Sequence, residues 1–220
     1  MKIQSKSMVD HTVNYLEDMI VKGKLGSGQR IKEQEVSTRL GISRPPVREA
    51  FKILEAEGLI RREPRRGVLV SEVTKDDIWE IYTLKIALYT LAVTLAIDRI
   101  SDSDIGKLER IVGQMETLAY GEANPDIIRY EDLNNLFHET TAAIAGHGRL
   151  KKIVQSLNNQ IKRVSYRSFT RKGHLQSSCR YHRQILEALK ARDKALAERL
   201  TKEHIEKGLA VHRELDEERH

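Results

Sequence analysis

The stretch from Arg39 to Val70, RLGISRPPVREAFKILEAEGLIRREPRRGVLV, decides the fold of the N-terminal part of this chain. Apolar residues at Val47, Phe51 and Leu54 follow helical spacing. Ser43 precedes this pattern as an expected N-cap, and two prolines occupy the first turn, where backbone N–H groups have no intrahelical acceptor. Two short strand-forming runs then flank EPRRG. The stretch therefore predicts a helix followed by a β-hairpin with an arginine-rich turn.

The residues before this helix predict a helix-turn-helix. Residues 9–21 carry apolar side chains at helical spacing, and EQEVSTRLG predicts a short helix that stops at Gly41. Arg44 and Arg48 lie one turn apart at the start of the second helix of the pair, the part that enters the major groove in such motifs. In this interpretation, the β-hairpin that follows is the wing of a winged helix-turn-helix. The alternative is a generic three-helix domain with a solvated basic hairpin.

Charge and cysteine content narrow the class of protein. Residues 1–73 hold 14 Lys and Arg against 10 Asp and Glu, and residues 74–220 hold 24 against 22. The excess of +4 in the shorter segment favours a polyanionic partner, although ordinary surface charge would also explain it. The single Cys179 excludes an internal disulfide framework and is typical of a reducing cytoplasm. Met1–Asp10 is polar and shows no signal-peptide pattern.

The motif L-G-x-S-R-x-P-V-R-E-A, followed by L-x-x-x-G-L and a glycine-tipped wing, resembles the winged helix-turn-helix of the GntR family of bacterial transcription regulators. The resemblance implies a DNA-facing surface made of Ser43, Arg44, Pro45, Arg48, Arg66 and Gly67. Some members have an arginine at the DNA-facing position where this chain has Gln34, and Gln34 is not included in this surface.

Residues 74–220 predict an antiparallel six-helix bundle, which makes the fold class mainly α, with an N-terminal winged helix-turn-helix and a small β-wing in residues 1–73. The expected helices span residues 78–99, 104–120, 125–146, 149–169, 177–192 and 193–217, the third with Asn124 as N-cap and Pro125 at its first position. The apolar run IYTLKIALYTLAVTLAI is interrupted by Lys85, Tyr and Thr, and we interpret it as an amphipathic or buried helix of a soluble protein and not as a membrane span.

Three histidines on three different helices each project from an apolar face: His138, His182 and His204. Unpaired buried polar groups cost on the order of 1–3 kcal/mol each, and one shared divalent cation would satisfy all three imidazoles. The alternative is that each histidine only forms hydrogen bonds. His11, His147, His174 and His220 lie at expected helix ends, loops or termini and are expected to be solvated, and His212 is expected near the site without ligating.

The bundle resembles the FCD effector domain of the FadR subfamily, through NNLFH, HRQILEALKARD and a histidine 22 residues after His182. The resemblance implies a metal site made of Asn134, His138, His182 and His204. Asn134 replaces the usual aspartate, so the site loses its anionic ligand. The identity of the ion (Zn, Ni, Co or Mn) is not determined by these ligands. Lys85 replaces an arginine and is expected to contact an effector carboxylate, as is Arg163, for which a solvated helix face is the alternative.

The combined expectation is a homodimeric transcription repressor or activator that binds a palindromic double-stranded DNA operator and responds to a small organic acid, in the cytoplasm of a bacterium at the nucleoid. A metal-dependent hydrolase is the alternative from another class. HETTA, however, lacks the second histidine of the H-E-x-x-H motif, and Glu139 lies on a different side of the helix from His138.

Overall fold

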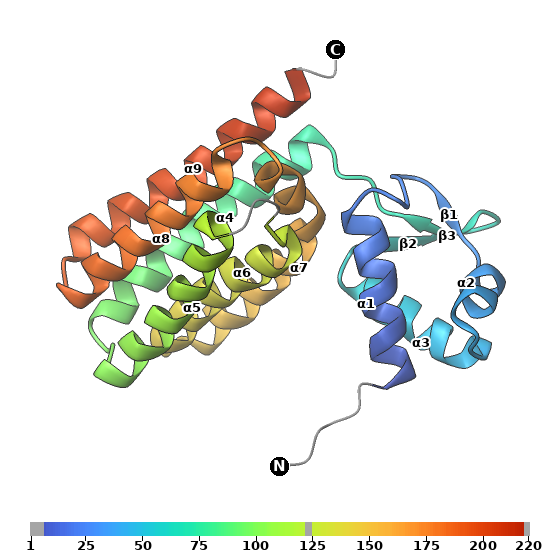
Figure 1. Ribbon diagram of the computed structural model, residues 1–220, viewed down its shortest axis with the longest axis horizontal. Coiled ribbons are helices and arrows are strands. Elements are labelled where there is room, and N and C mark those ends of the chain that lie inside the picture. The colour runs from blue at the N-terminus through green and yellow to red at the C-terminus, as the bar shows by residue number, and fades with distance from the viewer. Residues whose placement is uncertain (1–6, 122–124, 218–220) are drawn as a thin grey trace. The chain divides into compact units, whose positions relative to one another are not determined.

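The computed structural model describes residues 7–121 and 125–217, with the side chains of residues 159–164 and 216 excepted. The chain divides into two compact units, Met1–Thr74 and Lys75–His220 (Figure 1). The first unit combines three helices with a small sheet, and the second is entirely helical in its described residues. The predicted fold class is therefore confirmed.

The N-terminal unit contains helices α1 (Met8–Val21), α2 (Glu33–Leu40) and α3 (Arg44–Ala56), and strands β1 (Arg30–Ile31), β2 (Ile60–Glu63) and β3 (Gly67–Val70). The strands form an antiparallel sheet in the order β1-β3-β2. The two-residue strand β1 was not predicted, because two residues are too few to show an alternating pattern. Leu16, Val47, Phe51, Ile60 and Val70 are buried in one core that joins the helices to the sheet.

The turn between α2 and α3 is tight because Gly41 adopts the left-handed conformation, at φ 66°. Ser43 occupies the N-cap position of α3, as predicted, but its side chain makes no capping hydrogen bond. An N-cap oxygen accepts from the N–H of the second or third helical residue. Here these residues are Pro45 and Pro46, which have no N–H. The Ser43 hydroxyl is therefore left for another partner.

The C-terminal unit is a bundle of α4 (Lys75–Ile97), α5 (Asp102–Tyr120), α6 (Ile127–Ile144), α7 (Gly148–Phe169), α8 (His174–Lys190) and α9 (Lys194–Glu217). The prediction that Pro125 occupies the first position of α6 is wrong. Asp126 is the N-cap, because its side chain accepts a hydrogen bond from the Arg129 backbone N–H. The expected N-cap, Asn124, lies outside the described residues.

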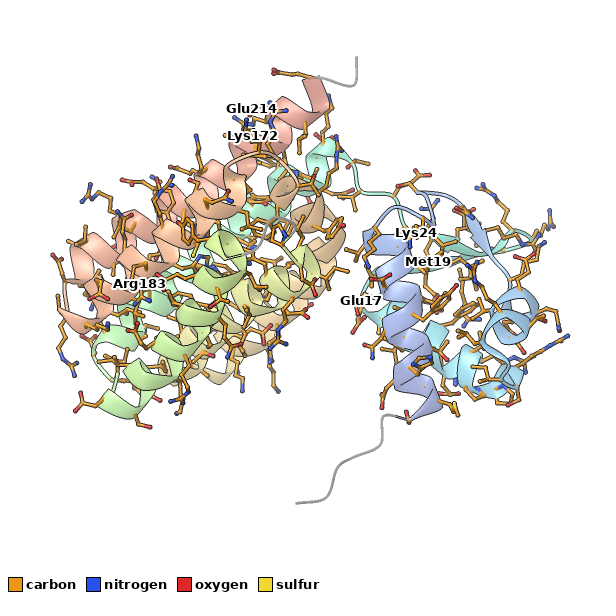
Figure 2. All side chains as sticks on the ribbon, in the orientation of Figure 1. Glu17, Met19, Lys24, Lys172, Arg183 and Glu214 are labelled. Carbon is orange, nitrogen blue, oxygen red and sulfur yellow. The ribbon has the colours of Figure 1, made fainter. Side chains whose placement is uncertain are left out.

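Apolar packing and one ion-pair cluster hold the bundle together. Helices α4 and α8 both pack against α9, and α5 packs against α6 and α8 (Figure 1). Buried Val93, Leu108 and Leu186, from three of these helices, belong to one core. Arg183 on α8 is labelled in Figure 2. It binds Glu116 on α5 through two guanidinium nitrogens, at 2.9 and 2.7 Å. Such bidentate pairs fix geometry as well as adding energy.

Helix α4 is apolar around most of its circumference. Trp79, Leu84 and Leu91 are exposed in a single copy of the chain, at 54%, 51% and 43% of their surface. Among the described residues, α4 is the one helix whose length and composition would allow it to cross a membrane, and 39% of its most apolar window is buried inside the bundle. A core helix of a soluble bundle has the same composition, so this is weak support for a membrane span.

Candidate DNA-reading surface and metal centre

The start of α3 presents an exposed polar face. Ser43, Arg44, Pro45 and Arg48 are all exposed there, while Val47, on the side of the helix that faces the core, is fully buried. The Arg44 guanidinium donates a hydrogen bond to the Gln34 side chain on α2. The predicted residues thus share one surface, on which two cations are oriented.

Arg48 lies beside an acidic residue of α2 that was not predicted to belong to this surface. Its Nε donates to Glu33 Oε2 at 2.8 Å, and Glu33 belongs to α2. The two residues are 15 positions apart, so no helical spacing links them.

The wing presents further arginines. Arg66 forms an ion pair with Glu63, at 2.7 Å between Nη1 and Oε2, and Gly67 starts β3 at φ 85°. Arg65 at the tip was missed. It is exposed, adopts a left-handed backbone at φ 65°, and makes no ion pair with any described residue. The signal for it in the sequence is the pair of arginines in EPRRG, of which only the second, Arg66, was predicted to face DNA.

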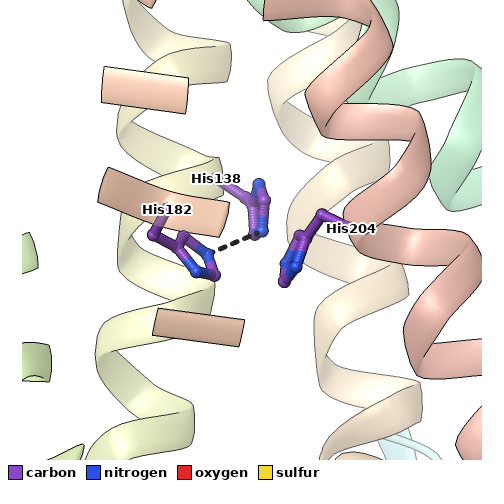
Figure 3. A group of neighbouring side chains, drawn as sticks. All are labelled: His138, His182 and His204. Carbon is purple, nitrogen blue, oxygen red and sulfur yellow. Dashed lines mark hydrogen bonds between the residues drawn. The ribbon is translucent and has the colours of Figure 1, made fainter. Parts of the chain in front are cut away.

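His138 on α6, His182 on α8 and His204 on α9 converge inside the bundle (Figure 3). One ring nitrogen from each lies within 4.8 Å of the others. The His138 and His182 Nε2 atoms are 3.2 Å apart, and the His182 and His204 ring centroids are 4.5 Å apart. All three side chains are at most 8% exposed. Three helices therefore bring three imidazoles to one buried point.

Burial keeps these imidazoles neutral. It lowers the pKa of His182 to about 4, and it holds the pKa values of His138 and His204 well below the usual range, with smaller contributions from neighbouring cationic groups. His182 donates its Nδ1–H to the Ser178 carbonyl at 2.8 Å, which fixes the tautomer and leaves Nε2 unprotonated. A neutral imidazole with its second nitrogen held by a carbonyl is the usual form of a metal-ligating histidine.

The donor set fits a divalent transition metal. Two imidazole nitrogens bound at about 2.0–2.1 Å to one tetrahedral ion would lie roughly 3.3 Å apart, and the His138–His182 separation is 3.2 Å. Asn134 is buried one turn before His138, and its Nδ2 donates to Asn135 at 3.4 Å. Its Oδ1 accepts no hydrogen bond from the described residues, so this oxygen is a candidate neutral ligand.

A cavity of about 30 Å³ adjoins the histidines. Its polar lining comes from Lys85, Asn134, His138, Ser165, Ser168, His174 and His204, with Tyr82 and Tyr89 beside them. This volume holds two or three waters, or part of a small acid.

Lys85 is the cation of this cavity. It is only 5% exposed, and its Nζ lies 5.1 Å from the Tyr89 ring centroid and 5.6 Å from that of Tyr82. Burial lowers the pKa of Lys85 to about 8, although the Glu131 carboxylate acts in the opposite direction. The side chain of Arg163, the other expected effector contact, lies outside the described residues.

Comparison with known proteins identifies both units. Residues 9–70 match the model of the bacterial regulatory proteins of the gntR family, and residues 80–207 match the FCD domain. The HTH-type transcriptional regulator YdhC of Bacillus subtilis is 32% identical over 193 residues, which cover 87% of this chain and 83% of YdhC. The chain belongs to the GntR family of bacterial transcription regulators.

Other GntR-family proteins extend the similarity. The gluconate operon transcriptional repressor of Bacillus subtilis is 31% identical over 205 residues, covering 87% of this chain and 80% of the repressor. The transcriptional repressor RspR of Escherichia coli is 28% identical, covering 85% and 81%. The structure of E. coli McbR/YncC has the same fold, with a TM-score of 0.77 at 22% identity over 95% of this chain and 98% of McbR/YncC.

Membership of the GntR family excludes the hydrolase alternative, because the family and its relatives are transcription regulators and not enzymes. The structure also shows that the Glu139 carboxylate is bound by two side-chain amides and is not placed as a general base beside the three histidines. Its carboxylate accepts hydrogen bonds from Asn158 at 3.2 Å and Gln155 at 3.4 Å.

The remaining histidines of this GntR-family regulator differ in burial. The expectation that His174 is solvated is wrong, because its side chain is only 7% exposed. His212 is also buried, with its Nε2 3.1 Å from the Tyr82 hydroxyl. His11 and His147 are exposed, as expected, and His220 lies outside the described residues.

Proposed function

We propose that this GntR-family regulator binds a palindromic operator as a homodimer, and that a small organic acid, bound beside a divalent metal ion in the FCD bundle, controls its operator affinity. The observation that supports this most is the buried cluster of His138, His182 and His204 beside the buried ammonium of Lys85. An effector domain of the FadR type would have this combination of metal ligands and a cation.

For the operator, we assign base and phosphate contacts to the start of α3. Arg44 and Arg48 are exposed on its first turns, where helix-turn-helix proteins contact guanine edges and backbone phosphates. The uncapped Ser43 hydroxyl and the adjacent Pro45 ring are exposed beside them. Because no N–H competes for that hydroxyl, it is available to a phosphate oxygen.

We assign a second contact to the wing. Arg65 and Arg66 are exposed beside Gly67, and Arg65 has no ion pair among the described residues. An exposed guanidinium at the tip of a hairpin suits the minor groove or a phosphate.

For the metal, we assign Asn134, His138, His182 and His204 as the ligands. When bound, the ion would act as a Lewis acid that attracts a carboxylate oxygen of the effector. With three neutral imidazoles and a neutral amide, the ligand set leaves the positive charge of the ion uncompensated, which favours an anionic effector. The ammonium of Lys85 lines the same cavity and adds to this preference.

For the dimer, we assign the exposed apolar face of α4 as the contact with a second copy. Asp76 and Glu80 lie near the start of this helix, and Arg99 lies just beyond its end. Antiparallel packing of two α4 helices about a two-fold axis would bury Leu84 and Leu91 of both copies, and it would bring Asp76 and Glu80 of one copy near Arg99 of the other. A dimer with two-fold symmetry matches the two-fold symmetry of a palindromic operator.

The regulatory step would be a population shift. An acid that binds one arrangement of the bundle more tightly than another changes the fraction of protein able to bind DNA, and a few kcal/mol of differential affinity is sufficient. Such a regulator would work in the bacterial cytoplasm at the nucleoid.

A mobility-shift titration of the operator region with wild type, Arg48→Ala and Lys52→Ala tests the DNA-binding surface. Loss of one guanine contact should weaken operator binding by about 1–3 kcal/mol, or roughly 5- to 150-fold, in Arg48→Ala. Lys52 is also exposed on α3, pairs with Glu49, and lies outside the assigned surface, so it serves as the matched control. Equal operator affinity in all three proteins would refute the assignment.

A melting-temperature screen tests the effector site. Small organic acids are added to protein with and without Zn²⁺, because a ligand of the folded state raises the melting temperature by mass action. We expect acids to stabilise the protein in the presence of metal and to change operator affinity in the same order. Acids that stabilise the protein without changing operator affinity would refute the regulatory role.

A further inference from the structure

A hollow of about 660 Å³ opens on the bundle where the end of α4 meets the turn between α6 and α7. Leu95 and Ala145 provide its apolar surface. Its other side chains are all exposed and carry basic or imidazole groups, those of Arg99, His147, Arg149 and Lys152. The hollow shares no lining residue with the cavity beside the three histidines. Sites for small molecules typically have volumes of about 300–1,000 Å³, so this hollow has the size of a separate ligand site.

The three cations of this hollow have no counter-charge on the chain. Arg99, Arg149 and Lys152 form no ion pair with any described residue. The acid next to Arg99 in the sequence, Asp98, binds Lys194 instead, at 3.2 Å. Like charges that line one concave surface repel each other, and a bound anion would replace this repulsion with attraction.

The sequence around the hollow lacks acids over a long range. Residues 140–186 contain ten Lys and Arg but no Asp or Glu, whereas the rest of residues 74–220 contain 14 against 22. The segment includes all of α7, whose start lines the hollow. Part of its charge is used within the fold, since Arg171 lies 3.9 Å from Glu214 on α9. The cations at the start of α7 have no such partner among the described residues, so this end of the helix attracts anions.

The turn between α6 and α7 lets a cation of α4 approach the start of α7. Gly146 has φ 66°, and a Cβ at this position would overlap Nη1 of Arg99 and lie 3.3 Å from its Cζ. His147 caps α7, because its Nδ1 accepts from the Leu150 N–H at 3.2 Å. The first two N–H groups of the helix form no hydrogen bond with any described residue. They add to the attraction that the three cations exert on an anion.

The number of positive charges indicates the kind of anion. A phosphate monoester carries about 1.5–2 negative charges near pH 7 and has three acceptor oxygens. A guanidinium can bind two of these oxygens at once. A carboxylate carries one charge on two oxygens and would leave more of the positive charge uncompensated. The apolar surface of Leu95 and Ala145 suits the carbon part of a phosphorylated molecule.

We propose that this hollow is a second ligand site of the protein and that it binds a small phosphorylated metabolite. The site is independent of the proposed effector cavity, because neither Lys85 nor any of the three clustered histidines lines it. Arg99 is also assigned to the contact between two copies. The variants that test the site therefore change Arg149 and Lys152 of α7.

Calorimetric titration with glucose 6-phosphate, glucuronate and glucose tests the ligand class, because these probes share a sugar ring and differ in the group at one end. The proteins are full-length wild type, the double variant Arg149→Ser with Lys152→Ser, and a control double variant, Lys151→Ser with Lys202→Ser. Both control lysines are exposed and lie outside the hollow, so the two double variants lose the same charge.

We expect wild type and the control to bind glucose 6-phosphate about tenfold or more tightly than glucuronate, and to bind glucose too weakly to measure. Binding of glucose 6-phosphate should be weakened about tenfold or more in Arg149→Ser with Lys152→Ser, the effect of losing one hydrogen bond to a charged group. The exchange variant Arg149→Lys with Lys152→Arg keeps both charges and should retain most of the affinity. An equal loss in the exchange variant would attribute the effect to altered packing and overturn the assignment.

Four further outcomes would overturn it. Wild type would then bind neither inorganic phosphate nor glucose 6-phosphate, or would bind glucuronate more tightly than glucose 6-phosphate. Loss of operator binding in Arg149→Ser with Lys152→Ser, with glucose 6-phosphate binding unchanged, would assign these cations to the DNA backbone. A monomeric double variant, together with a dimeric wild type that binds no phosphate, would show that acidic residues of a second copy occupy the hollow.

Discussion

At the scale of single residues, the neutral side chain of Asn134 determines the charge of the candidate metal centre. It is buried one turn from His138 and lines the same cavity as His204. An amide oxygen binds a divalent ion without neutralising it, so this centre depends on an anion from outside the chain more than a centre with an aspartate would.

Asn134→Asp should therefore increase the affinity for Zn²⁺ by about tenfold or more, because a carboxylate adds Coulomb attraction at contact distance in a buried site. Competition with a coloured chelator measures this change. Asn135→Asp is the matched control, since Asn135 is equally buried but does not line the cavity. An equal gain in both variants would show a general effect of charge and not ligation by residue 134.

Lys85 should make effector binding dependent on pH. Its pKa of about 8 means that the ammonium is present below pH 8 and is lost as the pH rises above it. The stabilisation of the Zn²⁺-loaded protein by a small organic acid such as lactate should therefore decrease between pH 7 and pH 9.5. Melting temperatures with and without lactate at each pH provide the measurement. Lys85→Arg should remove this dependence, because a guanidinium remains charged throughout the range. A parallel decrease in both proteins would assign the pH effect to another group.

At the scale of elements, α4 has two faces with different roles. One face carries Lys85 and Tyr89 into the bundle, and the other exposes Leu84 and Leu91. Contiguous exposed apolar surface is unusual on a monomer and is typical of an interface.

Leu84→Glu with Leu91→Glu should convert the proposed dimer to a monomer, because two charges from each copy would be buried against each other. Light scattering after size exclusion measures the mass. Leu136→Glu on α6 is the control, since Leu136 is also exposed, at 46%, but lies on another helix. A dimer that persists in the α4 variant, or that dissociates in the control, would contradict the assigned face.

The sequence was sufficient to predict most elements, because periodic apolar residues and glycine stops determine where long helices form and end. Prediction from the sequence failed where a contact between distant segments, or a single side chain, decides whether an element forms or where it starts. Strand β1 exists only through its pairing with β3, and α6 starts at Asp126 because that side chain captures a backbone N–H.

The candidate site shows the same limits. Each of its three histidines projects from an apolar helix face, which helical spacing revealed, and the structure brings them together. The burial of His174 was missed because a residue next to a glycine in a loop-like sequence has no periodicity to analyse. Glu33 was missed because its contact with Arg48 depends on how α2 and α3 pack.

At the scale of the whole molecule, buried histidines should make the fold sensitive to acid. The pKa of His174 is lowered to about 4 and that of His212 to about 3, mainly by burial. Below about pH 6.5 the unfolded chain takes up protons at these sites and the folded chain does not. Their contribution to stability is therefore complete above pH 6.5 and is lost as the pH falls towards 4.

Each of these histidines should reduce the free energy of unfolding by up to about 1.4 kcal/mol for each pH unit in that range. Urea unfolding at pH 7.5, 6.0 and 5.0 measures the slope. His212→Phe should have a shallower slope than wild type, whereas Leu136→Phe, an exposed position without a titrating group, should not change it. Identical slopes in all three proteins would show that carboxylates, and not buried histidines, cause the acid sensitivity.

The ion pair between Arg48 and Glu33 bears on how the protein searches a genome. In the proposed DNA complex, Nε of Arg48 can stay bound to the Glu33 carboxylate, at 2.8 Å, and the two terminal NH₂ groups are then left for DNA. These groups match the O6 and N7 acceptors of a guanine edge. The Glu33 carboxylate also repels nearby phosphates, so it would disfavour random sequence, which is held mainly through phosphates, more than the operator, and it would shorten the time spent on wrong sites. In Glu33→Gln, we expect binding to random duplex to tighten more than binding to the operator, so the protein would be slower to leave each incorrect site.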